Sequence, residues 1–197
     1  MHFAAEPKGV TEEATVRYDT ETKGSTFTVR AFATRMLSSL GHNPTISIPG
    51  IEGEIGLRPD AIEQSSLHMI VQESSLMVTD GISGKDREEI NRRIRDEVLE
   101  ATSFPQIEYR SSKVSASKTA EGQYWAGITG ELMMRGIKRT QPISARLSIN
   151  GTTLRAAGEF AIRQSDYEIR PVTTLAGAVK LKDELKFAFD ITARKQA

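Results

Sequence analysis

Residues 84–114 read GKDREEINRRIRDEVLEATSFPQIEYRSSKV and join a polar helix to a strand. The first half carries a narrow apolar stripe of residues spaced four apart, Ile90, Ile94 and Val98. Spacing of this kind places side chains on one face of a helix. Ser83 stands where a helix cap is needed, and the stretch that follows contains no internal glycine or proline. The pattern predicts one amphipathic helix over about 84–101.

The hydrophobic period changes after Pro105. Proline cannot continue a helix, and it pushes the preceding Phe104 towards extended backbone. Ile107 and Tyr109 then alternate with polar neighbours, which is typical of a half-buried strand. Because an isolated helix of this length is marginally stable, we expect it to lie on other structure. We interpret it as a lid or plug across one end of a barrel.

Alternating patterns dominate the rest of the chain. Two strands are predicted over 15–19 and 25–33, with a turn between them, and another over 61–72. Asn150-Gly151 is a strong hairpin signal, and residues 185–192 show the clearest alternation. Antiparallel strands in this number normally bury their edges by closing. The sequence therefore predicts an all-β fold, an antiparallel β-barrel of about eight strands with one helix.

Length and composition favour one domain without a nucleic-acid partner. The chain has 197 residues, and we expect a flexible arm over 1–13 and a single domain over 14–197. Lys+Arg and Asp+Glu both number 26, so no global basic field exists to attract nucleic acid. The basic segment 135–139 indicates a solvated loop.

Targeting and membrane signals are weak. The N-terminus lacks a basic region followed by an apolar run, and no window approaches the ~20 apolar residues that span a bilayer. We expect no membrane span and a cytoplasmic location, or a periplasmic one if a signal sequence was removed. There are no cysteines, which excludes disulfides and thiol nucleophiles but does not decide the compartment.

Catalytic and metal motifs are missing from the sequence. His2, His42 and His68 have no metal-ligand spacing, and we expect surface or hydrogen-bonding histidines. No GxSxG elbow or phosphate-binding loop is present. We therefore predict no catalytic residue and no metal site.

Several segments together resemble the YceI-like family. The helix–proline–strand stretch EVLEATSFPQIEYRSSKV (97–114) is followed by GELMMRGIKRTQPISARL (130–147), QSDYEI (164–169) and LAGAVKLKDELKFAFDITARK (175–195), in the family's order. The resemblance implies a lipocalin-like barrel that holds a long isoprenoid or similar amphiphile, usually without a catalytic site. Glu168 stands where the family usually has glycine, which predicts a different path for that loop. The GHxP element at 41–44 is similar to that of one subgroup.

Inward-facing strand positions supply the candidate ligand contacts. They are Phe27, Val29, Ile107, Tyr109, Ile128, Leu132, Ile143, Leu147, Phe160, Ile162, Phe187 and Phe189. Small residues such as Gly130, Ala145 and Gly158 share these faces and would leave room inside. The alternative is a packed core in which glycines mark bends. The residues alone leave both interpretations open, and the family resemblance favours a ligand.

The expected ligand is an amphiphilic lipid, a bound polyisoprenoid such as a prenyl quinone or prenyl phosphate, with no other cofactor. Its head group would lie at a rim formed by His42, Asn43, Arg163 and Asp166. The predicted function is that of a non-enzymatic carrier, as a homodimer. The alternatives are a packed-barrel interaction module in stress or envelope physiology, and an enzyme on a lipid-like substrate with His42 as acid or base.

Overall fold

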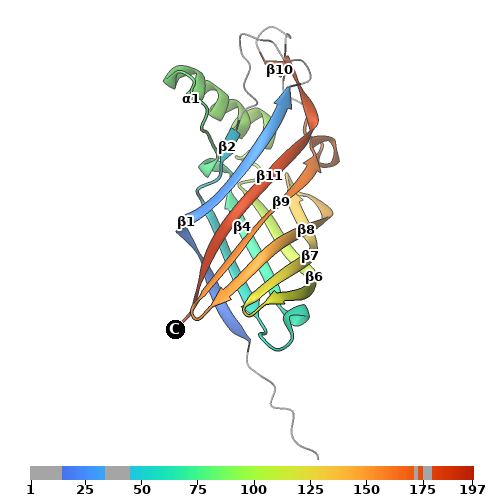
Figure 1. The fold of residues 1–197 in the computed structure, drawn as a ribbon. Coiled ribbons are helices and arrows are strands. Elements are labelled where there is room, and N and C mark those ends of the chain that lie inside the picture. Colours follow the sequence, from blue (N-terminus) through green and yellow to red (C-terminus); the bar gives the residue numbers. More distant parts are fainter. Residues whose placement is uncertain (1–14, 34–44, 171–172, 175–178) are drawn as a thin grey trace, which may run out of the picture.

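Eight strands form a closed antiparallel ring (Figure 1). The computed structural model describes residues 15–33, 45–170, 173–174 and 179–197. The strands of the ring are β1 (Val16–Ala33), β3 (Ile51–Leu57), β4 (Ser66–Gln72), β6 (Gln106–Ala120), β7 (Gln123–Met134), β8 (Ile137–Asn150), β9 (Thr153–Arg163) and β11 (Val179–Lys195). They pair in this order, and β11 closes the ring on β1. The predicted barrel is confirmed.

Short elements complete the fold. Strands β2 (Thr45–Ser47) and β5 (Met77–Val78) extend the sheet beside β1, and β10 (Thr173–Thr174) pairs with β11. The 3₁₀ turns are η1 (Ile62–Gln64), η2 (Glu73–Ser75) and η4 (Gln164–Tyr167). The strand predicted over 61–72 therefore begins later, at Ser66, because its first residues form η1.

The prediction of two strands in the first part of the chain was wrong. Strand β1 is continuous, and a bulge lies between Glu21 and Thr26 where a turn was expected. Gly24 has φ +91°, a conformation that favours glycine in a bulge as much as in a turn. Before the bulge β1 pairs with β3, and after it β1 pairs with β2, so the strand changes partner across the bulge.

The predicted helix is present at one end of the barrel. Helix α1 (Gly84–Arg93) continues as the π-helical segment η3 (Ile94–Leu99). The Ser83 Oγ accepts a 3.1 Å hydrogen bond from the Asp86 N–H, as expected for a cap. The helix ends at Glu100, whose backbone is left-handed (φ 56°), before Pro105 is reached. No helix in the described part of the chain is long and apolar enough to cross a membrane.

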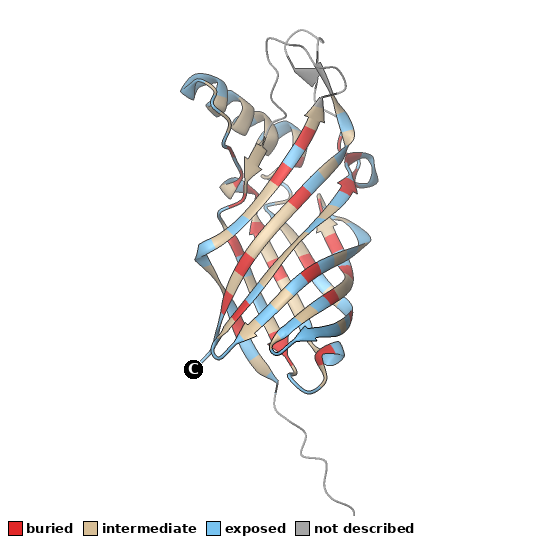
Figure 2. Cartoon of the chain, viewed as in Figure 1, coloured by how far each residue is buried: buried red, intermediate tan, exposed pale blue. Residues whose placement is uncertain are grey.

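Buried and exposed positions alternate along the strands of the barrel (Figure 2), and the end opposite the helix has its own buried side chains. A separate small cluster there consists of Tyr18, Leu57, Leu154 and Ala193, each at most 3% exposed. The main apolar cluster fills the middle of the barrel and continues to η3, where Leu99 is buried. The base of the barrel therefore has a compact apolar cluster of its own.

Candidate functional site: the barrel interior and its helix end

Four phenylalanines form the centre of the interior. Strand pairing places Phe27 opposite Phe189 and Phe187 opposite Phe160, all on the inward face. The rings of Phe160 and Phe187 stack with centroids 4.7 Å apart. The ring of Phe27 lies 5.9–6.3 Å from the other three. Because the rings come from three neighbouring strands, the alternation of those strands alone assembles the cluster.

The inward side chains are not uniformly buried. All twelve predicted contacts belong to the apolar clusters: Val29, Tyr109, Leu132, Ile162 and Phe187 are buried, whereas Phe27, Ile107, Ile128, Ile143, Leu147, Phe160 and Phe189 are half-buried. Inside a closed ring, an inward side chain that keeps accessible surface borders unfilled space. The interior is therefore incompletely packed around these half-buried side chains. The role of these residues as ligand contacts stays a prediction.

Two of the small inward residues do not leave room. A Cβ on Gly130 would lie 2.6 Å from the ring of Tyr109, and one on Gly158 would lie 2.8 Å from the ring of Phe189. The Tyr109 hydroxyl donates towards the carbonyls of Ile128 (3.2 Å) and Gln141 (3.1 Å), and burial raises its pKa to about 12. These glycines accommodate aromatic rings, so the space inside comes from other positions.

A buried carboxyl group lies at the helix end of the interior. Glu73 follows Leu67, Met69 and Val71 at the next position of the same alternation, and it is 0% exposed. Neither carboxylate oxygen has a hydrogen-bond partner. Burial raises the pKa of Glu73 to about 8, and the charge of Arg135 lowers it in part. The group is therefore largely protonated at neutral pH.

Arg135 holds three turns together beside this carboxyl. Its guanidinium pairs with the carboxylate of Glu100 and donates to the carbonyls of Glu168 (2.7 Å) and Tyr167 (3.4 Å). The Arg135 side chain is only 16% exposed, and its Nε is buried without a partner. The prediction of a solvated basic loop was wrong here, because Arg135 lies in the turn before β8 and points into the protein's own backbone.

The predicted rim is only partly described. His42 and Asn43 lie outside the described residues. Arg163 and Asp166 are both exposed, at the end of β9 and in η4. Within the described residues no hydrogen bond or ion pair joins Arg163 to Asp166. Ser165 between them donates to the Asp183 carboxylate through its N–H (2.8 Å) and its hydroxyl (2.6 Å). These two bonds, helped by the charge of Arg163, lower the pKa of Asp183.

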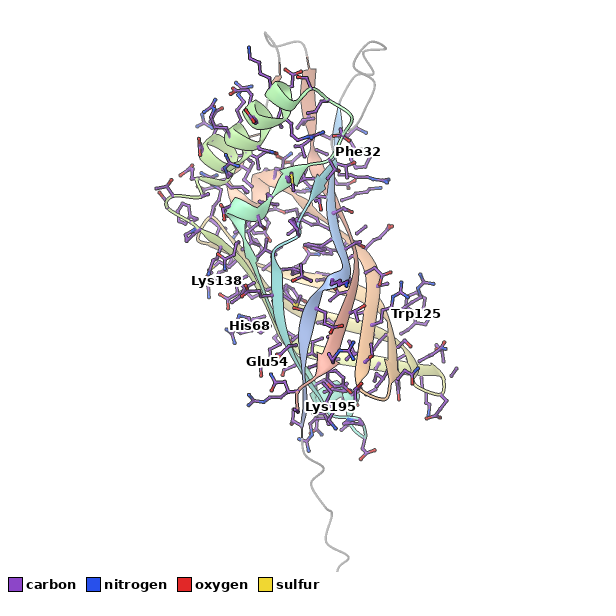
Figure 3. All side chains as sticks on the ribbon, turned by 90° about the vertical axis from the view of Figure 1, so that its left-hand side faces the viewer. Phe32, Glu54, His68, Trp125, Lys138 and Lys195 are labelled. Carbon is purple, nitrogen blue, oxygen red and sulfur yellow. The ribbon has the colours of Figure 1, made fainter. Side chains whose placement is uncertain are left out.

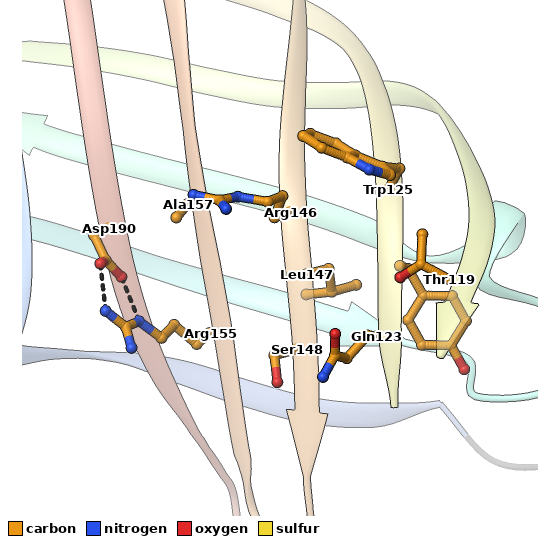
Figure 4. Close-up of a pocket in the computed structure, with 10 residues that line it drawn as sticks. Thr119, Gln123, Trp125, Arg146, Leu147, Ser148, Arg155, Ala157 and Asp190 are labelled. Carbon is orange, nitrogen blue, oxygen red and sulfur yellow. Dashed lines mark hydrogen bonds and ion pairs between the residues drawn. The ribbon is translucent and has the colours of Figure 1, made fainter. Parts of the chain in front are cut away.

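Two shallow hollows lie on the outer wall. One of about 530 Å³ surrounds Trp125, which is 53% exposed, beside the ion pair of Arg155 and Asp190 (Figure 4). The other, of about 380 Å³, includes His68, on the other side of the barrel in Figure 3. His68 Nε2 lies 2.6 Å from Glu108 Oε1, which confirms the expected hydrogen-bonding histidine. Within the described ranges no group of three or more His, Asp or Glu side chains is placed to hold a metal.

The geometry defines a closed lipocalin-like barrel with an apolar interior. The chain belongs to the YceI-like domain family, whose sequence profile matches residues 8–193. Comparison with curated proteins gives no match.

Solved structures show the same fold at low sequence identity. BcnA of Burkholderia cenocepacia is 16% identical, with a TM-score of 0.67 over 88% of this chain and 98% of that one. A polyisoprenoid-binding domain of Saccharophagus degradans is 11% identical, with a TM-score of 0.64 over 91% and 98%. The YceI protein of Campylobacter jejuni is 13% identical, with a TM-score of 0.59 over 79% and 87%.

Sequence reasoning missed Glu73 and Arg135. A signal for Glu73 was present, since a charged residue follows three apolar ones at the inward position of one alternation. Arg135 gave no such signal, because its partners lie more than thirty positions away in two other turns.

Proposed function

We propose that this protein is a non-enzymatic binding protein that carries a polyisoprenoid or comparable amphiphile with its tail in the barrel interior. The observation that supports it most is the accessible surface that the inward-facing rings of Phe27, Phe160 and Phe189 keep in the middle of the barrel. A packed barrel would bury Phe27, Phe160 and Phe189 as completely as Leu57 and Leu154.

An apolar tail suits this interior. Burial of a hydrocarbon contributes ~0.8 kcal/mol per methylene, from which the cost of association is subtracted. A tail of several isoprene units therefore needs little polar recognition, and the interior offers mainly aliphatic and aromatic surface. Membership of the YceI-like family and the similar fold of a polyisoprenoid-binding domain support the same class of ligand.

Native mass spectrometry of protein purified gently from its host, followed by lipid extraction, tests the proposal. We expect a one-to-one adduct that solvent releases and that contains repeating isoprene units. A bare protein mass, together with failure of the delipidated protein to load any prenyl alcohol, prenyl quinone or prenyl phosphate, would overturn it.

One observation favours a second candidate, an interaction module. Trp125 is exposed on the outer wall over a hollow that also contains Arg146 and Arg155. Exposed tryptophan and arginine are enriched at protein interfaces. Capture of a partner that is lost in Trp125→Ala, by protein that carries no lipid, would favour this candidate over the carrier.

A further inference from the structure

We propose that Glu73 and Arg135 form the head-group end of the interior and select an amphiphile with a neutral, hydrogen-bonding head, such as a hydroxyl, over one with a phosphate head. This inference rests on the proposed function and specifies its ligand class. It assigns the recognition to residues beside η3, and not to Arg163 and Asp166, which are exposed.

The backbone fixes where the Glu73 side chain lies. The Glu73 N–H donates to the carbonyl of Pro105 (3.0 Å), and its own carbonyl accepts from the Leu76 N–H (3.3 Å). Val71 before it and Leu76 after it both belong to the main apolar cluster. The carboxyl group is therefore buried between two members of the apolar cluster, in the turn η2, which packs against η3.

The polar atoms at this end lack partners. Both carboxylate oxygens of Glu73 and the Nε of Arg135 are buried without a hydrogen bond. The other such atoms in the described part of the chain are the Nε atoms of Arg87 and Arg93, both on α1. Native proteins rarely leave buried polar atoms unpaired, and each case calls for a missing water, ion or ligand. Here a carboxyl group and a donor lie within electrostatic range of each other, and neither has a partner in the protein.

The chemistry of this pair matches a neutral head. With its pKa near 8, Glu73 is largely a neutral acid at pH 7, so it donates one hydrogen bond and accepts another. A hydroxyl accepts from the acid, or from the Nε–H of Arg135, and donates to the second carboxyl oxygen. A phosphate needs several donors and brings at least one negative charge. The remaining guanidinium atoms of Arg135 are already committed to Glu100 and two carbonyls, so that charge would stay uncompensated.

The test compares two probes with one tail, geranylgeraniol and geranylgeranyl monophosphate, on delipidated full-length protein at pH 7. Their dissociation constants are measured by titration with native mass spectrometry. We expect the alcohol to bind at least tenfold more tightly. Glu73→Gln should keep the alcohol affinity within threefold, because an amide also donates and accepts. Glu73→Leu should lose about tenfold for the alcohol and less than threefold for the phosphate.

Controls separate this site from the fold and from the proposed function. Glu159→Leu, on the exposed face of β9, should change neither affinity, and Glu73→Met is measured beside the Leu variant in case that one fails to fold. A phosphate bound as tightly as the alcohol, an unchanged preference in the apolar variants, or a Gln variant as weak as they are would overturn the head-group assignment while prenyl binding stands. If wild-type protein loads neither probe nor a prenyl quinone, the proposed function itself fails.

Discussion

The guanidinium of Arg135 donates a 2.7 Å hydrogen bond to the backbone carbonyl of Glu168, and both residues have left-handed backbone, with φ of 50° and 55°. Glu100, which pairs with the same guanidinium, has φ 56°. These are the non-glycine residues with positive φ in the described part of the chain. One side chain therefore holds three strained turns, at the end of η3, before β8 and after η4.

Replacement of Arg135 should loosen the helix end. We expect Arg135→Met to lower the free energy of unfolding by about 2–3 kcal/mol, because hydrogen bonds to charged groups contribute about 1.5–3 kcal/mol each. Arg135→Lys should recover only part of this, since an ammonium cannot reach three partners at once. Urea denaturation measures the change. Arg139→Met, at an exposed position of β8, is the control. An equally small effect in both variants would show that Arg135 does not hold the three turns together.

Glycine at position 168 should stabilise the fold. A left-handed backbone costs a non-glycine residue about 1–2 kcal/mol, while glycine adopts it freely at some cost in chain entropy. The bond from Arg135 goes to the backbone carbonyl, so Glu168→Gly keeps it. We expect a gain of about 0.5–1 kcal/mol in the same urea titration. Glu100→Gly serves as comparison, because it relieves a similar φ but loses its ion pair, and it should show no gain.

Glu73 should make stability fall as the solution becomes alkaline. Its pKa is raised from 4.5 to about 8, so between these values the folded chain holds a proton that the unfolded chain has released. The contribution of Glu73 to the free energy of unfolding is fully present below pH 4.5. It falls by about 1.4 kcal/mol per pH unit as the pH rises from there to about 8. Asp183 and Asp190 have pKa values that are lowered in the folded chain. Their contribution to stability is therefore present at neutral pH and is lost as the pH falls below the pKa of the unfolded chain.

The difference in unfolding free energy between wild type and Glu73→Gln isolates the pH dependence that comes from Glu73. Chemical denaturation at a series of pH values should show wild type losing stability relative to the variant from pH 5 to pH 8. Arg135 is the charged group that acts on Glu73, and it pairs with Glu100; wild type and the variant both keep these two residues. Parallel curves would mean that Glu73 is ionised in the folded protein.

A larger side chain inside the barrel should shorten the tail that fits. Ile143 on β8 is half-buried and lies opposite Ile128 on the inward face. We expect Ile143→Trp to remain folded, at a cost of about 1–3 kcal/mol for overpacking, and to exclude the longest prenyl alcohols that wild type accepts. Ile70→Trp, beside the outer hollow, should leave the length limit unchanged. An identical length limit in both variants would place the tail elsewhere.

Local patterns carried most of the fold. The Ser83 cap, the helix, the Asn150-Gly151 hairpin and the alternation of the last strand are each decided by neighbouring residues, and each is found as predicted. The bulge in β1 could not be predicted, because Gly24 suits a bulge or a turn and only pairing with β11 decides between them. The three turns in which Glu100, Arg135 and Glu168 have left-handed backbone depend on contacts between distant segments, which a local pattern does not contain.

The candidate site was predictable only in its apolar part. Alternation identified the inward phenylalanines, whereas the space around them depends on how far each side chain reaches across a closed ring. Glu168 has the left-handed backbone that favours glycine, and Arg135 binds its carbonyl. Glutamate in place of the family's glycine therefore does not require another backbone conformation at this position.

Photo-crosslinking with a prenyl alcohol that carries a diazirine near the end of its tail tests the central claim most directly. The delipidated protein is loaded, irradiated and digested, and the modified residues are identified by mass spectrometry. We expect the labelling to be concentrated on inward-facing side chains such as Ile128, Ile143 and Phe160. Labelling confined to Trp125 and its neighbours on the outer wall, or no labelling above that of a non-binding protein, would contradict it.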